Sequence, residues 1–370
     1  MVKKSYIMRN IVLLLTVTIA SGLNAAVLVV DNTPGAGAPY TTLQPAINAA
    51  SADDTIMVQS SALSYGSVTI GKKLVLIGPG HHPETAKNAT IGIITMNNGS
   101  SGTTITGMEV QAVHGAVNQV AHDLRILRNY FFYQSPIRAN TGGGSSSNGW
   151  LIEGNVFVEN TDCGGCLMIN LDKQTSNNWV FRNNIFITRA TATSNTRLFS
   201  DLNATTVLYH NIIIHRNLGH IFGGPIGSWG DESFNALLQN NIIWVTNASV
   251  TDIDVNCTNC QWVHNLTYHS SATLDVLPGT TNLDNTDPQF VNVTISNYGY
   301  DHDYHCSPGS PGETGASDGG MLGIFGGGYP FSMNGYPEDI PIMLEMILDN
   351  VIIKQGNNST VRVRAVGGAD

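Results

Sequence analysis

The feature that most constrains this chain is an asparagine that returns at nearly regular intervals, each time inside a short apolar segment. The six positions are Asn129, Asn155, Asn184, Asn211, Asn241 and Asn265, separated by 26, 29, 27, 30 and 24 residues. A coil of three short strands and three turns uses roughly 20–30 residues, and successive coils stack about 4.8 Å apart. An Asn at one place in each coil accepts left-handed backbone, and its amide can bond to the next Asn along the stack. The spacing therefore predicts an all-β, right-handed parallel β-helix.

Two earlier segments place Gly78 and Gly107 in the same slot, which fits because glycine also accepts positive φ. Loops inserted between strands account for the unequal gaps. Other repeat folds fit less well: the chain lacks the regular leucines of leucine-rich repeats, and a propeller blade needs about 40 residues or more. A β-sandwich would show no fixed residue at a fixed spacing.

The N-terminal end of the predicted helix carries its own signal. Residues 40–50 have helical periodicity, and residues 53–58 and 73–78 follow as strands. A short amphipathic helix here would close the open end of the first coil, whose backbone edge would otherwise invite aggregation.

Both ends of this region resemble a known family. Residues 40–58, 65–66 and 72–78 look like the opening of the pectin lyase-like right-handed β-helix superfamily, and residues 303–311 and 318–327 resemble its closing segment in secreted Bacteroidota-type members. The resemblance covers roughly residues 30–330 and implies the fold. It leaves the activity open, because that superfamily contains lyases, hydrolases, epimerases and adhesins.

The chain divides into three predicted parts. Residues 1–25 read as a signal peptide, with Lys3, Lys4 and Arg9 before an apolar stretch at 11–20 and a cleavage site near Ala25. That stretch is shorter than the roughly 20 residues that span a bilayer, so we expect a secreted, extracellular or periplasmic protein without a transmembrane segment. Residues 26–330 form the β-helix. Residues 331–370 form a C-terminal extension with strands near 340–347, 350–353 and 360–365.

The charge balance excludes nucleic acid as a partner. Without the three basic residues of the signal peptide, 14 Lys and Arg (17 minus 3) face 27 Asp and Glu, which gives a net charge of −13. Nucleic-acid binding needs clustered Lys and Arg to neutralise phosphates.

Five cysteines are present, at positions 163, 166, 257, 260 and 306. The two Cys-x-x-Cys pairs are more than three coils apart, or roughly 15 Å, so one zinc ion with bonds of about 2.3 Å cannot join them. Two local disulfides suit an exported protein better, and the odd count leaves one unpaired thiol or an intermolecular bond.

Acidic residues form a second column nine to thirteen residues before the ladder asparagines: Asp172, Asp201, Asp231, Glu232, Asp252 and Asp254. Lyases of the superfamily bind acidic polysaccharide through carboxylate-held Ca²⁺, with a Lys or Arg as the base, and carboxylates a few ångströms apart suit Ca²⁺. By that resemblance Lys173, the only lysine between Lys87 and Lys354, is the candidate base, with Asp172 tuning it or holding metal. Alternatively, these acids are solvated or cap turns.

Arginines form a third column, because Arg189 and Arg216 each follow a ladder Asn by five residues. Stacked arginines can bind carboxylates bidentately, which makes both candidate catalytic residues; the alternative is ordinary surface charge. His210 and His264 precede ladder asparagines in a slot that also takes Arg, Gly and Asn, so we expect an exposed turn position.

Aromatic residues next to the ladder are expected in the core: Tyr130, Phe131, Phe157 and Phe186. Five tryptophans leave two alternatives open, a sugar-binding platform or a cover over the core. They are Trp150, Trp179, Trp229, Trp244 and Trp262.

Two functions fit these patterns. The first is a secreted protein that binds acidic polysaccharide or cleaves it by β-elimination. The second is a non-catalytic extracellular or cell-surface β-helix, structural or adhesin-like. The acid column and the superfamily favour the first. The absence of a recognisable catalytic motif, such as paired Arg around a Pro, favours the second.

Overall fold

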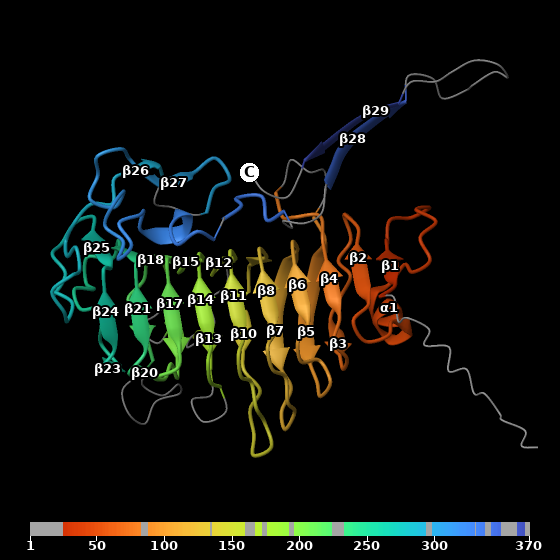
Figure 1. Cartoon of the computed structure of the whole chain (residues 1–370), viewed down its shortest axis with the longest axis horizontal. Helices are drawn as coiled ribbons and strands as arrows, with labels where there is room; N and C mark the ends of the chain where they lie inside the picture. Colours follow the sequence, from red (N-terminus) through yellow and green to blue (C-terminus); the bar gives the residue numbers. More distant parts are fainter. Residues whose placement is uncertain are drawn as a thin grey trace, which may run out of the picture.

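The chain folds into a parallel β-helix, which confirms the predicted fold (Figure 1). The computed structural model describes residues 25–82, 88–133, 135–159, 167–171, 176–191, 196–223, 233–293, 298–329, 331–336, 342–348 and 361–366. The predicted signal peptide lies almost wholly outside these residues.

The first sheet takes one strand from each coil, and its described strands all pair in parallel. In spatial order they are β1 (Val27–Val30), β2 (Thr55–Val58), β4 (Val75–Ile77), β6 (Thr104–Thr106), β8 (Arg125–Leu127), β11 (Leu151–Glu153), β14 (Val180–Arg182), β17 (Val207–Tyr209), β21 (Leu237–Gln239) and β24 (Gln261–Val263).

The remaining strands of the coils form two further faces of the β-helix, and two long strands connect these faces. Strands β5 (Thr90–Met96) and β7 (Glu109–Gly115) run across both faces, and β3 (Val68–Ile70) pairs with β5. The face next to the ladder, called the second sheet, continues with β9 (Tyr130–Phe131), β12 (Val156–Val158), β15 (Ile185–Ile187), β18 (Ile212–His215), β22 (Ile242–Val245) and β25 (Leu266–His269). The third sheet continues with β10 (Ile137–Arg138), β13 (Leu167–Asn170), β16 (Arg197–Ser200) and β19 (His220–Phe222).

The predicted asparagine ladder is present at the turn between the first and second sheets. The Nδ2 of Asn155 donates to the Oδ1 of Asn184 at 3.1 Å, and Asn184 donates to Asn211 at 3.0 Å. The same bond joins all six predicted asparagines and ends on Asn282, a seventh member. Each of the six also donates to a carbonyl of the preceding coil, for example Asn184 to Ile152 at 2.8 Å. The buried amides are therefore fully engaged.

The left-handed backbone belongs to the residue before each ladder asparagine. This pre-ladder position has φ between 52° and 66° in Arg128, Gly154, Asn183, His210, Asn240 and His264. Strand pairing places Gly107 and Gly78 in that column, so their predicted placement in the asparagine slot was wrong by one residue. The asparagine supplies the amide, while its predecessor supplies the positive φ.

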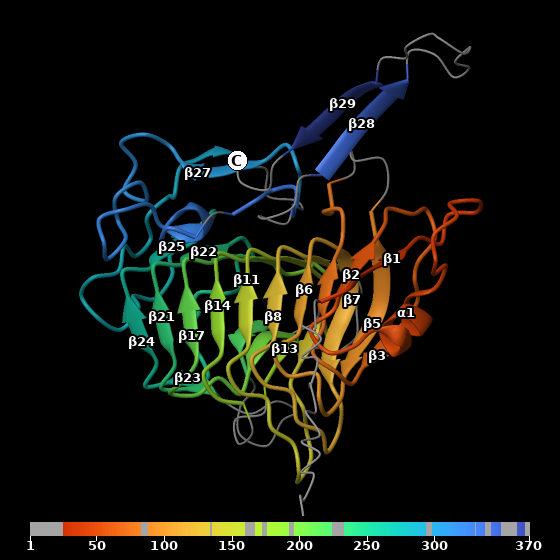
Figure 2. The same ribbon diagram turned by 45° about the vertical axis from the view of Figure 1, so that its right-hand side comes forward.

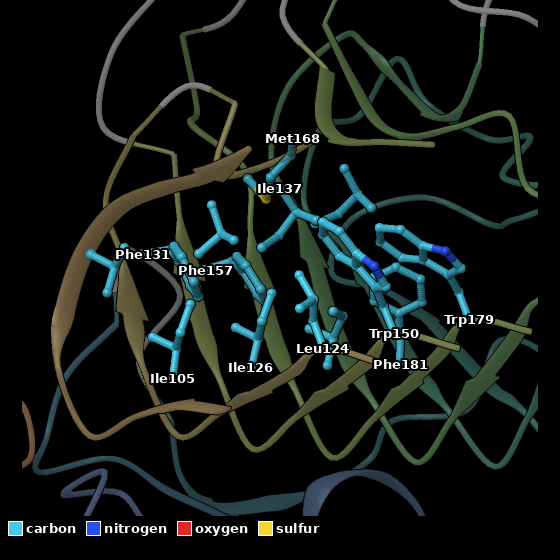
Figure 3. Packing of buried hydrophobic residues seen from close by; sticks show 14 of the residues in the cluster. Ile105, Leu124, Ile126, Phe131, Ile137, Trp150, Phe157, Met168, Trp179 and Phe181 are labelled. Atoms are coloured by element: carbon cyan, nitrogen blue, oxygen red, sulfur yellow. The ribbon is translucent and has the colours of Figure 1, made fainter. Parts of the chain in front are cut away.

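The interior is filled by stacked side chains, as Figure 3 shows. Phe131, Phe157 and Phe186 stack in adjacent coils with ring centroids 4.7 and 4.8 Å apart, which confirms their predicted core position. Tyr130 differs, because it points outward and is only partly buried.

The outward side of the second sheet is also apolar and is covered by the C-terminal part of the chain. Ile185, Ile212 and Ile242 face outward there and are fully buried. Residues 312–329 and 331–336, called the strap, cover them together with β27 (Asp303–Cys306) (Figures 1 and 2). Where the strap and β27 lie on it, this sheet face is therefore a second core.

The ends add elements that close or extend the helix. Helix α1 (Leu43–Ala49) is the predicted amphipathic helix and buries Leu43, Ala46 and Ile47 against the first coil. Strand β1 precedes it and was not anticipated. The remaining named elements are β20 (Ser233–Phe234), β23 (Cys257–Thr258), β26 (Phe290–Asn292), η1 (Gly323–Phe325), β28 (Ile342–Leu348) and β29 (Val361–Val366).

Two antiparallel pairs belong to the C-terminal part of the chain. Strand β26 pairs with β27, and β28 pairs with β29, which projects away from the helix in Figure 1. Two of the three strands predicted beyond residue 331 are thus present. The third, at 350–353, lies outside the described residues.

Candidate functional site

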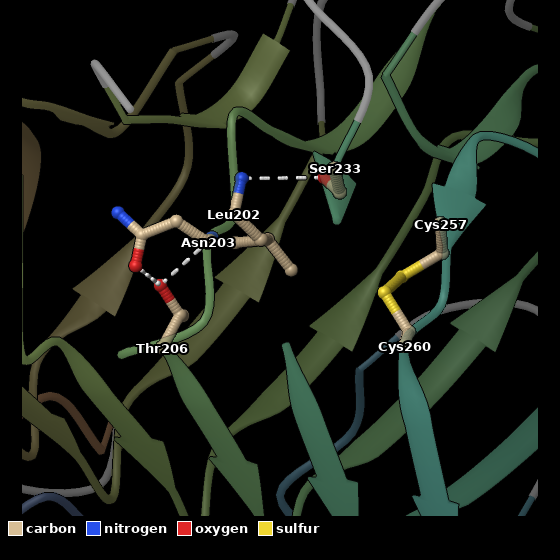
Figure 4. The surroundings of a disulfide bond; sticks show 6 residues. All are labelled: Leu202, Asn203, Thr206, Ser233, Cys257 and Cys260. Carbon is tan, nitrogen blue, oxygen red and sulfur yellow. Dashed lines mark hydrogen bonds between the residues drawn. A yellow bond between two sulfur atoms is a disulfide. The ribbon is translucent and has the colours of Figure 1, made fainter. Parts of the chain in front are cut away.

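The acid column begins at the corner that follows the third sheet. Asp201 comes directly after β16 with a φ of 62°, so it forms the turn, and its Oδ2 accepts the Ser200 hydroxyl at 3.0 Å. The next residue, Leu202, donates its N–H to Ser233 Oγ, and Ser233 pairs with Cys257 (Figure 4). Asp201 therefore aligns with Asn256, two coils further on. Asn256 also has a positive φ, of 66°.

Asp252 and Asp254 lie near the level at which the strands of the third sheet begin, whereas Asp201 lies just after one of these strands ends. Asp252 acts electrostatically on His220, the first residue of β19, whose strand partner is Arg197. Burial, followed by the hydrogen bond and charge of Asp252, raises the pKa of Asp254 to about 6. The structure thus brings these two carboxylates together and leaves Asp201 in a different row.

Four predicted site residues lie outside the described part of the chain: Asp172, Lys173, Asp231 and Glu232. Among the residues that are described, no group of three or more His, Cys, Asp or Glu side chains is arranged to hold a metal ion. The calcium site stays a prediction, since three of its six proposed ligands are among those four residues.

The two predicted arginines do stack. The N–H of Thr188 bonds to Ile214 O at 3.1 Å, and the N–H of Arg216 bonds to Thr188 Oγ1 at 2.8 Å, so Arg189 and Arg216 occupy matching places in adjacent coils. Both are partly exposed at the corner between the second and third sheets. Burial lowers the pKa of the Arg216 guanidinium.

This corner is called the arginine corner, and a small cavity next to it is lined by four ionisable side chains: Glu159, Arg197, His215 and His220. The carboxylate of Glu159 accepts the backbone N–H of Arg189 at 2.8 Å. Burial and then the charge of Arg197 lower the pKa of His220. Sequence reasoning found the two stacked arginines but not these neighbours, which come from other strands.

The pre-ladder histidines are not exposed, so that expectation was wrong. His210 is fully buried, and its Nδ1 bonds to Gly323 O of the strap at 3.2 Å. His264 Nδ1 bonds to Gly315 O, and Asn183 Nδ2 donates to Ile324 O at 2.7 Å. The side chains at the pre-ladder position therefore bind the strap in several of the coils.

The strap and β27 also enclose a pocket of about 730 Å³, which local sequence patterns do not reveal. Its described lining is His302, Asp303, His305, Phe325, Gly328, Tyr329, Phe331 and Met333.

Cys257 and Cys260 form the predicted local disulfide (Figure 4). Among the described cysteines Cys306 is unpaired, and burial raises its pKa to about 12. Cys163 and Cys166 lie outside the described residues.

The tryptophans in the described part of the chain cover the core. Trp150 and Trp179 are fully buried and stack at 4.3 Å, and Trp262 and Trp244 are 3% and 8% exposed. This excludes a sugar platform for these four; Trp229 lies outside the described residues.

No protein-family model matches the sequence, and no curated protein is similar to it. Within its described residues, the chain has no helix that is both long and apolar enough to cross a bilayer. The fold therefore defines the class of the protein as an all-β parallel solenoid.

Proposed function

We propose that the protein is a secreted member of the pectin lyase-like superfamily that binds an acidic polysaccharide along the arginine corner. The observation that supports this most is the matching position of Arg189 and Arg216 in adjacent coils. Coils repeat at about 4.8 Å, so these two residues follow one another along the helix axis, as carboxylates follow one another along a linear polyanion.

The neighbours of these arginines suit the same ligand. Arg197 adds a positive group and His220 a protonatable one, while the buried amide of Asn217 donates to Glu159 Oε2 at 3.5 Å. Glu159 contributes a carboxylate whose Oε2 accepts the Arg189 N–H at 2.8 Å. In a chain with a net charge of −10, a local group of cations favours a defined ligand over general attraction to polyanions.

Binding is tested by affinity electrophoresis in polygalacturonate and alginate, with dextran as the neutral polymer. The double variant Arg189→Gln, Arg216→Gln is expected to lose at least tenfold in affinity for an acidic polymer, and wild-type binding should weaken as salt rises. The matched control is Arg125→Gln, an exposed arginine on the first sheet. Equal binding by wild type and double variant, or no binding to either acidic polymer, would exclude this site and favour a structural or adhesin-like role.

A catalytic extension is β-elimination at the neighbouring corner, with Lys173 as base and Ca²⁺ held by Asp172 and Asp201. It is favoured by the pairing of Asn170 with Ser200, since Asp172 and Asp201 follow these partners closely in the sequence. Ultraviolet absorbance of the unsaturated product, measured with Ca²⁺, tests it. Lys173→Gln should abolish product formation while leaving polymer binding intact, and no product from the wild type on either polymer rules out the lyase for these substrates.

A further inference from the structure

The pocket between β27 and the strap shares no lining residue with the cavity at the arginine corner and has a different chemistry. Its volume of about 730 Å³ is within the range of roughly 300–1,000 Å³ typical of small-molecule sites. Aromatic rings and Met333 supply most of its walls, while His302, Asp303 and His305 supply polar atoms. Apolar walls with a few converging polar groups are the usual composition of such sites.

The polar side of the pocket is held in a defined orientation. Asp303 Oδ1 accepts the backbone N–H of His305 at 3.0 Å and lies 2.6 Å from its Nδ1, so the ring donates through Nδ1. The same ring stacks on Phe325, with centroids 3.6 Å apart and planes 5° apart. With Nδ1 engaged and the side chain 47% exposed, Nε2 is the ring atom left to bond a ligand.

The carboxylate of Asp303 stays ionised over a wide pH range. Its partial burial opposes ionisation, but the hydrogen bonds and charge of His305 outweigh burial and lower the pKa. Its side chain is 42% exposed, so it can accept a hydrogen bond from a hydroxyl group.

The aromatic side of the pocket is built from the strap. Phe325 and Phe331 meet edge to face at 90°, and Tyr329 is 36% exposed at the rim. Gly328, with a φ of 69°, has open space where a side chain would stand, so the chain turns here without filling the pocket. Rings of this kind pack against the C–H faces of a sugar.

Arg182, which contacts the pocket residue Tyr329, is already neutralised. Arg182 lies over the Tyr329 ring at 3.4 Å, and both its Nε and its Nη2 are 2.5 Å from Glu153 Oε2. The imidazole of His305 also faces a carboxylate, with its Nδ1 2.6 Å from Asp303 Oδ1. The described lining thus offers no uncompensated positive charge to a carboxylated ligand.

From this geometry we propose that the pocket is a second ligand site and that it binds a neutral sugar residue, such as the end of a neutral oligosaccharide. The sugar hydroxyls bond to His305 Nε2 and to the Asp303 carboxylate, and one ring face packs on the aromatic wall. The site is separate from the acidic polysaccharide site, and it does not depend on that proposal.

The test is isothermal titration calorimetry with the full chain and the neutral disaccharides cellobiose, lactose and maltose at millimolar concentration, with digalacturonic acid as the charged comparison. At least one neutral disaccharide should bind, and digalacturonic acid should bind at least tenfold more weakly at this site. His305→Ala and Phe325→Leu are each expected to weaken neutral binding at least tenfold. His305 is exposed, so its variant keeps the fold.

The control is His122→Ala, which removes a half-buried imidazole that accepts one hydrogen bond, from Asn148 N–H at 3.0 Å, and this variant should bind like the wild type. The variant Arg189→Gln, Arg216→Gln should also keep neutral binding, which separates the two sites. The proposal is overturned if no neutral disaccharide binds to the wild type, or if His305→Ala and Phe325→Leu both bind like the wild type.

Discussion

At the residue scale, the ladder asparagine matters because it satisfies several buried groups at once. Asn184 is fully buried, its Oδ1 accepts both the N–H and the Nδ2 of Asn155, and its Nδ2 donates to two further oxygens. A buried donor or acceptor left without a partner costs roughly 1–3 kcal/mol. One side chain therefore affects three coils.

We predict that Asn184→Ala lowers the free energy of unfolding by about 3–5 kcal/mol, since it orphans several buried partners and leaves a cavity. Urea unfolding followed by circular dichroism measures the loss. The control is Asn98→Ala, which removes an exposed amide with a single bond to Val120 N–H and should cost less than about 1 kcal/mol. Equal losses in the two variants would contradict a special role for the ladder.

The sequence predicts the ladder well because a polar side chain that recurs inside buried apolar segments needs a partner in each coil, and stacking supplies one. It misses Asn282, because the last coil is short and places this residue 17 positions after Asn265. It misjudges His210 because the strap residue that covers it, Gly323, is 113 positions away. The pocket is missed for the same reason, since no local pattern joins His305 to Tyr329. Long-range covering segments are what a repeat pattern cannot reveal.

At the element scale, the strap makes the second sheet a two-sided core. Ile324 is fully buried against the outward side of that sheet, and the backbone around it bonds to Asn183. The strap is therefore held both by apolar contact and by the pre-ladder side chains.

We predict that Ile324→Ala lowers the free energy of unfolding by about 2–5 kcal/mol, the range for truncating a buried Leu, Ile or Met to Ala. Hydrogen exchange should speed up in residues 315–326 more than in the ladder strands. The matched control is Val291→Ala, in the same C-terminal region but 52% exposed, with an expected loss under about 0.5 kcal/mol. Faster exchange in the ladder strands with an unchanged strap would show that the strap is not a separate layer.

At the scale of the whole molecule, buried neutral histidines make stability depend on pH. Burial lowers the pKa of His81 to about 3 and that of His215 to about 4. His215 Nε2 donates to Gly219 O, and its Nδ1 accepts no hydrogen bond from any described residue, so a second proton there would have no partner. Because the folded pKa lies below the unfolded one, stability is complete above about pH 6.5 and falls as pH drops toward 4.

We predict that His215→Gln removes part of this acid sensitivity. The wild type should lose roughly 3 kcal/mol from this one group between pH 8 and pH 4, and the variant should show a correspondingly smaller loss. Urea unfolding at pH 8, 6, 5 and 4 measures both slopes. Asp254 acts in the opposite direction, since its raised pKa favours the folded state as pH falls through about 6. Identical slopes for wild type and variant would mean that His215 does not remain neutral in the folded protein.

The strap crosses the coils in the opposite order to the chain. It meets His264 through Gly315, Asn240 through Ser317, His210 through Gly323 and Arg128 through Tyr336. Duplicating or deleting one coil would shift every later anchor by about 4.8 Å relative to a segment of fixed length. Ordinary solenoids can grow or shrink by whole repeats, whereas this one can change its number of coils only if the returning segment changes length at the same time.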